Sequence, residues 1–431
     1  MSHLPSYRVL MYSHDAYGMG NIRRTLAICR QLTESLPNIS ILLLTGSPII
    51  HALRIPPRVD YLKLPCLTRD RSECFSAKYW DIPWKELIKM RSDIMLSAVK
   101  RFRPDLVLVD KKPAGIKREF LKTVQYIRKN MPRCRLVLGL RDILDDPRVT
   151  VPIWRSNGYF DLIEKYYHQV WIYGSPAIFD AVREYHMPEG VARKVVYTGY
   201  LGRPLNPWQA TAASDLPETN GNPLSLVMVG GGGDGFPLLN DYLEGVLQGH
   251  LRLPANHLLI SGPEMPADKR ELLQQHCANG HPIGLREYTD AIENYLRAAD
   301  MVVSMGGYNS VCEILSFRKR AVIVPRITPV SEQFIRARRL ARLGLIRMID
   351  PRELSPQRLM AEVEAAYRGK GLTIASVQDY IDLNGLPKVA ELTRRLCEEG
   401  AAAAERSTVP YRHSRSLSVP VMSNLCLVKS R

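Results

Sequence analysis

The sequence predicts an α/β protein built from two doubly wound domains in tandem. Strand-like and helix-like segments alternate along most of the 431 residues, and the strand-like segments are continuous apolar runs. Such runs are typical of parallel strands that helices cover on both faces. A proline-rich stretch, Gly202–Pro223, divides the series in two. Because the chain is too long for one ordinary core, we expect two domains whose strand ends face a common cleft.

The first domain is expected over residues 1–201, opening with a strand at Arg8–Tyr12 and a helix at Asn21–Glu34. Short apolar runs predict its other strands, and periodic apolar patterns predict its other helices. The strands are Ile41–Leu44, Leu106–Val109, Leu136–Leu140 and Val170–Tyr173, and the helices are Trp84–Val99 and Phe120–Arg128.

The second domain is expected over residues 224–400, after a linker at 202–223. Its strands are Leu224–Val229, Leu258–Ile260, Met301–Ser304 and Ala321–Val324, and its helices are one ending near Leu247, then Asp268–His276, Asn309–Phe317, Glu332–Leu343 and Pro356–Tyr367. A helix at Pro387–Glu398 can cross back to the first domain. The basic, Ser/Arg-rich tail at 401–431 has a composition typical of disorder.

The composition favours a cytoplasmic chain with reduced thiols. The first residues lack a basic segment followed by an apolar one, and no run of about 18 apolar residues could cross a membrane. Eight cysteines are scattered without a Cys-x-x-Cys pair or a Cys/His cluster. That pattern argues against a disulfide framework and against a structural metal site.

Positive charge is concentrated in one part of the chain. The formal net charge is +16, and Lys100–Arg135 holds twelve Lys and Arg residues against three acidic ones, a local balance of +9. Such a segment attracts anionic surfaces, or it is simply a solvated face. It belongs to no recognised nucleic-acid module, so we expect no nucleic-acid partner.

The first glycine-rich loop follows the first strand. Gly18 and Gly20 let the backbone turn sharply before a helix, and His14, Asp15 and Asn21 lie in the same loop. The third glycine of the dinucleotide fingerprint is missing, and no acidic residue ends the second strand. A nicotinamide oxidoreductase is therefore disfavoured. Close packing of helix on strand would explain the glycines, but not the polar side chains beside them.

The second glycine-rich loop, Gly230–Gly235, lies between a strand and a helix and includes Gly231, Gly232 and Gly233. Free amides at a helix N-terminus suit a diphosphate. The loop lacks the Lys-Ser/Thr of a P-loop, so ATP hydrolysis by that route is not expected. The alternative is a loop that serves only packing.

Two further strand ends carry polar residues. After Met301–Ser304 come Gly306, Gly307, Asn309, Ser310 and Glu313, and the next strand end is followed by Glu332 and Gln333. Glu313 could accept hydrogen bonds from a ribose diol, or merely complement the helix dipole. Glu332 and Gln333 suit sugar hydroxyls, or form an ordinary capping element. At successive strand ends of one sheet, these residues line one crevice.

These motifs resemble those of a known family. The C-terminal half is similar to the nucleotide-sugar domain of the family-28 glycosyltransferases, which include the N-acetylglucosaminyltransferase of the peptidoglycan lipid intermediate. The matching residues are Tyr288-Thr289-Asp290, Ala299–Ser304, Gly306-Gly307, Glu313, Pro325 and Glu332-Gln333. Gly18-x-Gly20-Asn21-x-x-Arg24 resembles the family's G-x-G-H opening, and Tyr12–Arg24 is most similar to an uncharacterised bacterial group of predicted glycosyltransferases. The resemblance covers residues 7–367 and implies the GT-B fold, two Rossmann-like domains facing a cleft.

The resemblance also implies an activity and its residues. The chain would transfer a hexose or N-acetylhexosamine from a nucleotide-diphosphate sugar, UDP-linked, with inversion. Glu313 would hold the ribose, Glu332 and Gln333 the sugar, Arg203 the phosphates, and the backbone at Tyr288-Thr289 the uracil. There are two departures from the family pattern: Gly232 replaces a serine, and Asn21 replaces the histidine of G-x-G-H. Asparagine cannot take up a proton at neutral pH.

Glycosyl transfer needs a stabilised diphosphate and a base for the acceptor hydroxyl. Helix N-termini and Arg203 can stabilise the diphosphate, and no Asp-x-Asp motif occurs, so we expect no metal and no cofactor. The base is expected to be His14, with Asp15 orienting it or acting in its place. Two alternatives stay open: hydrolysis of the nucleotide sugar, and a non-catalytic nucleotide-sugar binding or regulatory protein.

The acceptor is expected to bind the N-terminal domain. Trp80 and Trp84 lie just before the basic segment, and cationic residues beside exposed aromatics suit an anionic bilayer. This pattern predicts peripheral binding at the inner face of the membrane and a lipid-linked acceptor. The alternative is that both tryptophans lie in the core.

Overall fold

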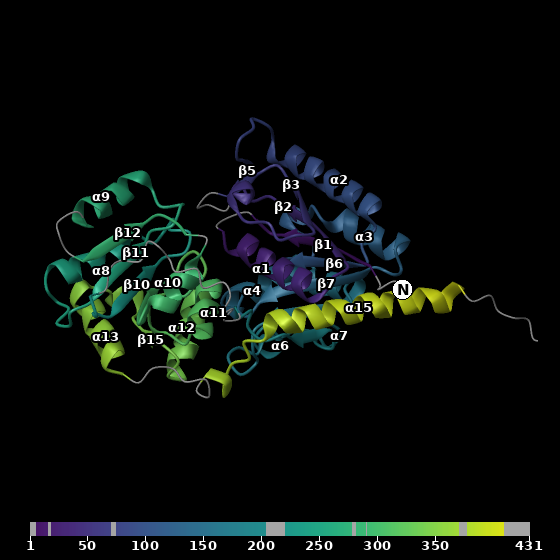
Figure 1. Ribbon diagram of the computed structural model, residues 1–431. Helices are drawn as coiled ribbons and strands as arrows, with labels where there is room; N and C mark the ends of the chain where they lie inside the picture. Colours follow the sequence, from purple (N-terminus) through teal and green to yellow (C-terminus); the bar gives the residue numbers. More distant parts are fainter. Residues whose placement is uncertain are drawn as a thin grey trace, which may run out of the picture.

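The computed structural model describes residues 6–15, 19–69, 75–203, 220–277, 282–289, 291–369 and 377–408. Two α/β domains lie next to each other, and a long last helix returns along the first of them (Figure 1). Most of the predicted linker and residues 409–431 of the predicted tail lie outside the described residues.

The first domain is built on a parallel sheet of seven strands in the order β3-β2-β1-β6-β7-β8-β9. The strands are β1 (Tyr7–Ser13), β2 (Ile39–Thr45), β3 (Val59–Lys63), β6 (Leu106–Asp110), β7 (Arg135–Arg141), β8 (Gln169–Tyr173) and β9 (Val195–Tyr197). A separate antiparallel hairpin, β4 (Leu67–Arg69) and β5 (Phe75–Ala77), follows β3.

Helices cover both faces of this sheet. They are α1 (Gly20–Ser35), α2 (Trp84–Phe102), α3 (Leu121–Asn130), α4 (Pro147–Ser156), α5 (Tyr159–Tyr166), α6 (Ala181–Glu184) and α7 (Glu189–Ala192), with 3-10 turns η1 (Ile50–Ala52) and η2 (Ile116–Arg118). The first strand is apolar at nearly every position, and all but one of its residues are buried, as expected for a strand between two helical layers.

The second domain repeats this design with a parallel sheet in the order β12-β11-β10-β13-β14-β15. Its strands are β10 (Leu224–Met228), β11 (Asn256–Ile260), β12 (Ile283–Arg286), β13 (Met301–Ser304), β14 (Arg320–Ile323) and β15 (Arg347–Met348). Its helices are α8 (Phe236–Leu247), α9 (Ala267–Cys277), α10 (Ile292–Ala298), α11 (Tyr308–Ser316), α12 (Glu332–Arg342) and α13 (Pro356–Arg368), with a 3-10 turn η4 (Pro351–Glu353).

In both sheets the first strand in sequence lies in the interior. β1 pairs with β2 on one side and β6 on the other, and β10 pairs with β11 and β13. The connections leave these central pairs in opposite directions, which opens a crevice at the carboxyl ends of the strands. The glycine-rich loops after β1, β10 and β13 all begin at such ends.

One apolar cluster runs through both domains. It includes Met11 and Ile22 of the first domain and Met228 and Ile314 of the second, joined through Leu201. Two further clusters fill the opposite faces of the two sheets. Because one core is shared, the relative position of the domains is set by packing as well as by the linker.

The last helix, α15 (Gly385–Thr408), packs against α1 of the first domain. The Tyr7 hydroxyl donates to Glu398 over 3.3 Å, and a Cβ at Gly400 would collide with the carbonyl oxygen of Arg133. The crossing back expected for 387–398 is therefore confirmed. The prediction of a disordered tail from residue 401 is wrong for residues 401–408, where the alanine run extends the helix.

Candidate functional site

A buried ion pair joins the two domains beside the crevice. Arg336 of α12 donates to both carboxylate oxygens of Asp142, which follows β7, over 2.8 and 2.7 Å. Arg336 is fully buried and also donates to Glu332 and to the Gly306 carbonyl. Its guanidinium lies 5.6 Å from the centre of the Tyr308 ring, which stacks on Tyr200. This pair positions the second domain against the first domain.

Glu332 lies at the centre of an arginine cluster. Its carboxylate contacts Arg141 at 3.0 Å and Arg336 at 2.7 Å, and Arg326 lies 3.9 Å away. Burial alone would raise the pKa of Glu332, but these guanidinium groups outweigh it and lower the pKa to about 2. Glu332 is therefore charged at neutral pH, and it meets Arg141 of the first domain.

Glu313 and Arg203 are in contact. The Glu313 carboxylate, 2% exposed, lies 3.0 Å from Arg203 and 3.3 Å from Arg23 of α1. Arg203 also contacts Glu293 of α10. Burial alone would lower the pKa of Arg203, but the Glu313 and Glu293 carboxylates outweigh this effect and raise the pKa. The residues expected to hold ribose and phosphate thus lie together, in a network that includes α1.

The loop after β13 reaches the first domain through its polar side chains. Asn309 donates to the Gly20 carbonyl over 3.0 Å, and Ser310 follows it in the first turn of α11. Gly306 has a positive φ of 71°, and Gly307 begins the helix as its N-cap. Gln333 accepts a hydrogen bond from the Arg326 amide, and its amide group faces Gly307. One edge of the crevice is therefore formed by Gly20, Gly306, Gly307, Asn309, Ser310 and Gln333.

Packing explains part of the loop at Gly230–Gly235. Gly232 has a φ of 91°, and a Cβ there would collide with the Ser261 carbonyl oxygen. Gly235 is packed against Val229 in the same way. Gly231 has the Glu264 carboxylate beside it, whereas Gly233 is exposed. The loop is thus shaped by its neighbours and still presents backbone at Gly231 and Gly233 before α8.

Tyr288 and Thr289 follow β12, the edge strand of the second sheet. The Tyr288 side chain is exposed, and the Thr289 hydroxyl accepts a hydrogen bond from the Ala291 amide. They lie two strands from the glycine-rich loop after β10. Their expected role toward uracil stays a prediction.

His14 and Asp15 follow β1 and are 5% and 4% exposed. Asp15 accepts hydrogen bonds from Thr45 at 2.5 Å and Ser13 at 2.9 Å. Burial raises the pKa of Asp15 to about 6, although both hydrogen bonds lower it. The His14 ring lies edge-on to Tyr12, with centroids 6.4 Å apart.

Asn21 is tied into the first domain. Its amide nitrogen donates to the His14 carbonyl, and its oxygen accepts from Arg24, which pairs with Asp110 over 2.6 Å. At the position of the family histidine, this chain thus has a side chain that fixes the loop on α1. Gly18 lies outside the described residues.

Sequence reasoning missed several charged residues at the site, namely Asp110, Lys111, Arg141, Asp142, Arg326 and Arg336. Burial, reinforced by Arg141 and Lys112, lowers the pKa of Lys111 to about 7, and its backbone has a φ of 69°. The spacing of Glu332 and Arg336, four residues apart on a predicted helix, was a signal for one ion pair. Nothing local in the sequence indicated that Asp142 would complete it.

Comparison with known proteins finds relatives of the C-terminal domain. Residues 226–378 match the model of the glycosyltransferase family 28 C-terminal domain. The C-terminal domain is thus similar to that of the family-28 glycosyltransferases. A Shouchella clausii relative, a UDP-N-acetylglucosamine–N-acetylmuramyl-(pentapeptide) pyrophosphoryl-undecaprenol N-acetylglucosamine transferase, is 30% identical over 135 residues, 28% of this chain and 37% of its own. The chain thus spans about a third of the length of the curated relatives it matches.

Solved structures show the fold over nearly the whole chain. The Acinetobacter baumannii MurG structure has a TM-score of 0.52 at 14% identity, covering 92% of this chain and 100% of that one. A putative UDP-N-acetylglucosamine 2-epimerase from Listeria monocytogenes has a TM-score of 0.57 at 12% identity, covering 94% and 99%. The fold is GT-B, as the sequence analysis predicted. Transferases and an epimerase share this fold, so the fold alone does not identify the reaction. The match to the family-28 domain is the more specific indication of it.

The loop after β1 generates a prediction about the base. His14→Ala should lower kcat for sugar transfer by ~10²–10⁴-fold and leave donor affinity near wild type, because a general base acts in the transition state. His51→Ala, at an exposed histidine of the same domain, is the matched control.

The pH dependence separates His14 from Asp15. If Asp15 is the base, activity should rise as the pH increases through about 6, where its carboxyl loses the proton. Asp15→Asn would then abolish that limb and cause the larger loss, which would overturn the assignment to His14. If neither variant matters while Asn21→His raises activity, the native loop is not built for base catalysis.

Proposed function

We propose that this protein transfers a hexose or N-acetylhexosamine from a UDP-linked sugar to an acceptor hydroxyl, with inversion. The observation that carries the proposal is the family-28 domain at residues 226–378, whose expected donor residues lie at the strand ends of β10, β13 and β14. Loops at adjacent ends of a parallel sheet converge on one ligand. The Shouchella clausii relative is named for transfer from UDP-N-acetylglucosamine.

The charges of the site suit a nucleotide diphosphate. The N-termini of α8 and α11 and the guanidinium of Arg203 offer positive charge to the two phosphates. The Glu313 carboxylate lies beside Arg203 and Arg23, and a carboxylate is an acceptor that ribose hydroxyls prefer. Glu332 and Gln333 follow on the next strand end, where the sugar of the donor would lie.

The transfer step balances with these groups. The acceptor oxygen attacks the anomeric carbon from the face opposite the diphosphate, and the bond from that carbon to the phosphate oxygen breaks. The acceptor proton passes to His14 or Asp15, and UDP leaves with the electron pair. Arg203 and the helix N-termini stabilise the charge that develops on the leaving group, so we propose a metal-independent reaction without a cofactor.

The donor site generates a prediction about nucleotide binding. UDP-sugars should raise the melting temperature more than GDP- or dTDP-sugars do, because only the nucleotide that fits the site stabilises the folded state. Glu313→Ala should weaken UDP-sugar binding by ~1–3 kcal/mol, since it removes charge-assisted hydrogen bonds to the ribose. Glu391→Ala, an exposed carboxylate on α15, is the control.

Turnover with and without an acceptor extract distinguishes the proposal from its alternatives. Added EDTA, which removes metal ions, should leave the rate of turnover unchanged. A sugar–acceptor product supports transfer. Free sugar and UDP would instead show a hydrolase, and binding without turnover a binding protein. Unchanged UDP-sugar affinity in Glu313→Ala would leave Glu313 only the role of an ion-pair partner of Arg203 and Arg23.

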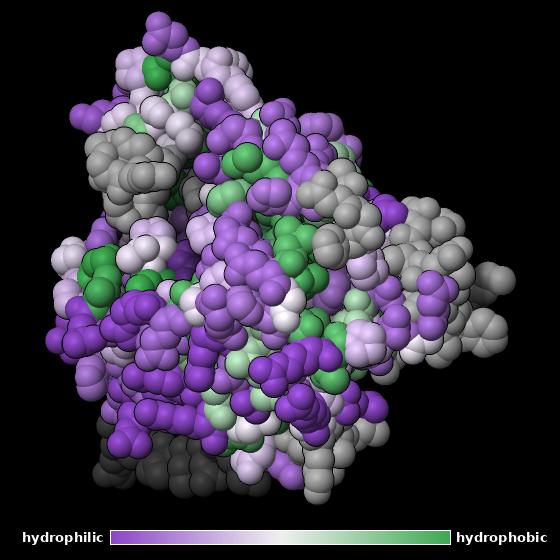
Figure 2. Space-filling model, turned by 90° about the vertical axis from the view of Figure 1, so that its left-hand side faces the viewer, coloured by the Kyte–Doolittle hydropathy of each residue, from purple (hydrophilic) through white to green (hydrophobic). Residues whose placement is uncertain are grey.

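We further propose peripheral binding to anionic membranes at their cytoplasmic face and a lipid-linked acceptor. Leu62, Tyr79, Trp80 and Met90 are all exposed in the first domain, and Trp80 is 51% exposed, so it is not a core residue. Lys117 of the basic segment lies 5.7 Å from the centre of the Trp84 ring. Figure 2, which faces the second domain, shows a mostly hydrophilic surface with apolar side chains between the polar ones. Within the described chain, no helix is long and apolar enough to span a bilayer.

Vesicle sedimentation tests the membrane proposal. The protein should sediment with anionic vesicles at low salt and be released at high salt, because each Lys or Arg near the surface contributes ~1 kcal/mol that salt screens. Neutral vesicles are the control. Equal recovery in the supernatant under all conditions would favour a soluble acceptor.

A further inference from the structure

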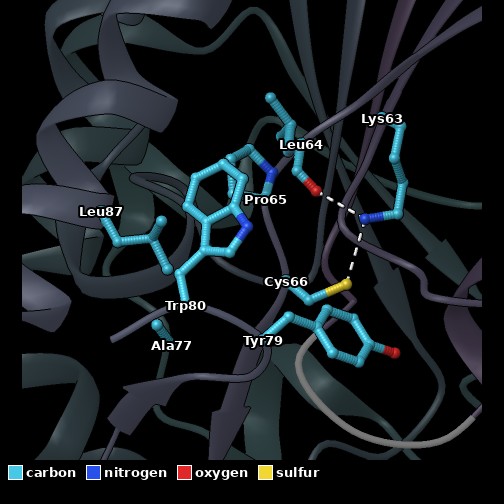
Figure 3. Close-up of a pocket in the computed structure, with 8 residues that line it drawn as sticks. All are labelled: Lys63, Leu64, Pro65, Cys66, Ala77, Tyr79, Trp80 and Leu87. Atoms are coloured by element: carbon cyan, nitrogen blue, oxygen red, sulfur yellow. Dashed lines mark hydrogen bonds between the residues drawn. The ribbon is translucent and has the colours of Figure 1, made fainter. Parts of the chain in front are cut away.

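A cavity lies in the first domain, outside the donor residues described above. Its volume is about 200 Å³, and it lies between the end of β3, the β4–β5 hairpin and α2 (Figure 3). The lining residues are Lys63, Leu64, Pro65, Cys66, Ala77, Tyr79, Trp80 and Leu87. The lining thus combines aliphatic and aromatic groups with one lysine.

The cavity adjoins the loop of the candidate base. The Leu64 amide donates to the Thr45 carbonyl over 2.7 Å, and the Cys66 thiol contacts the Gly46 carbonyl. The Thr45 hydroxyl in turn donates to Asp15. One residue, Thr45, therefore separates the wall of the cavity from the carboxylate that can accept the acceptor proton.

The hairpin beside the cavity also faces the donor domain. Burial raises the pKa of Glu264, and the ammonium group of Lys78, next to the cavity residues Ala77 and Tyr79, opposes that rise across the domain boundary. The Glu264 carboxylate lies against Gly231 of the glycine-rich loop. The backbone amide of Glu264 donates to the Gly231 carbonyl over 2.7 Å. The hairpin thus approaches the loop where the donor diphosphate is proposed to bind.

The chemistry of the lining selects a ligand. Tyr79 and Trp80 are 66% and 51% exposed, more than large aromatic side chains usually are without a partner. Lys63 donates to the Leu64 carbonyl over 2.7 Å and to the Cys66 thiol over 3.0 Å, which holds its ammonium group at the cavity (Figure 3). Among the lining residues that the structure describes, there is no carboxylate. An apolar group fits the aromatic walls, and an anion fits the lysine.

We propose that this cavity is the acceptor subsite and that it takes an acceptor with a compact apolar group next to an anionic one. The apolar group would pack against Trp80 and Tyr79, and the anion would bind Lys63. The acceptor role rests on the proposed glycosyl transfer, whereas the binding chemistry rests on the cavity alone.

Calorimetry with two probes tests the binding chemistry. Naphthalene-2-sulfonate carries both features, and 2-naphthol is its uncharged counterpart. Trp80→Ala should weaken both probes by about tenfold, because it removes an aromatic wall. Lys63→Met should weaken only the sulfonate, by about tenfold, and Lys63→Arg should restore it, because a charge-assisted hydrogen bond is lost and regained. Lys89→Met on α2 and Tyr380→Ala in the C-terminal segment are controls, since Lys89 and Tyr380 are both exposed.

The same variants, assayed for transfer, test the acceptor role. Trp80→Ala and Lys63→Met should raise the KM for the acceptor and leave UDP-sugar affinity unchanged. Probe affinities equal to wild type in both variants would overturn the proposed ligand chemistry. Altered probe affinity with an unchanged acceptor KM would overturn the acceptor role. A failure of the proposed function itself would differ, because neither the wild-type chain nor any variant would then form a sugar–acceptor product, whatever the probe affinities are.

Discussion

The ion pair between Arg336 and Asp142 is the interaction on which the arrangement of the site depends. Both side chains are almost completely buried, and they come from different domains. Burial alone would lower the pKa of Arg336, but the Asp142 and Glu332 carboxylates raise it, so the guanidinium stays charged. Removing one partner of such a pair costs about 3–5 kcal/mol, because the other charge is left buried and unpaired. Because this contact is costly to break, the carboxyl ends of the strands in the two sheets stay opposite each other.

From this pair the charges of the crevice extend in two directions. Glu332 connects Arg336 to Arg141 and Arg326, and Glu313 connects Arg203 to Arg23. These five arginines also pair with Asp142, Glu293 and Asp234, so the cluster holds five arginines and five carboxylates. Ribose or sugar hydroxyls can donate to Glu313 and Glu332 without breaking every ion pair of the cluster.

Much of the fold could be predicted from the sequence, because each strand is a short apolar run and each helix an amphipathic one. The strand predicted at Met301–Ser304 has those bounds in the structure, and Pro356–Tyr367 differs by one residue. Strands with few apolar residues were missed, such as β3, where Asp60 and Lys63 interrupt the pattern, and the two-residue β15. The hairpin β4–β5 was missed because its strands have only three residues each.

The candidate site could be predicted only where its residues share a loop or a strand end. Glu313, Glu332 and Gln333 stand in recognisable motifs, and the structure brings them to neighbouring strand ends. Their partners could not be predicted, because Arg23 and Arg141 come from the other domain and meet Glu313 and Glu332 only when the domains pack. The cavity beside Trp80 could not be predicted either, because its walls come from three separate elements of the first domain.

The central claim is that a nucleotide diphosphate binds at the strand ends of β10, β13 and β14. Hydrogen–deuterium exchange of the full chain with and without UDP tests it most directly, because a bound ligand slows the exchange of the backbone amides that it covers. The account predicts slower exchange at 230–235 and 306–313, and no change along residues 385–403 of α15. Unchanged exchange in both loops, or protection confined to the first domain, would contradict it.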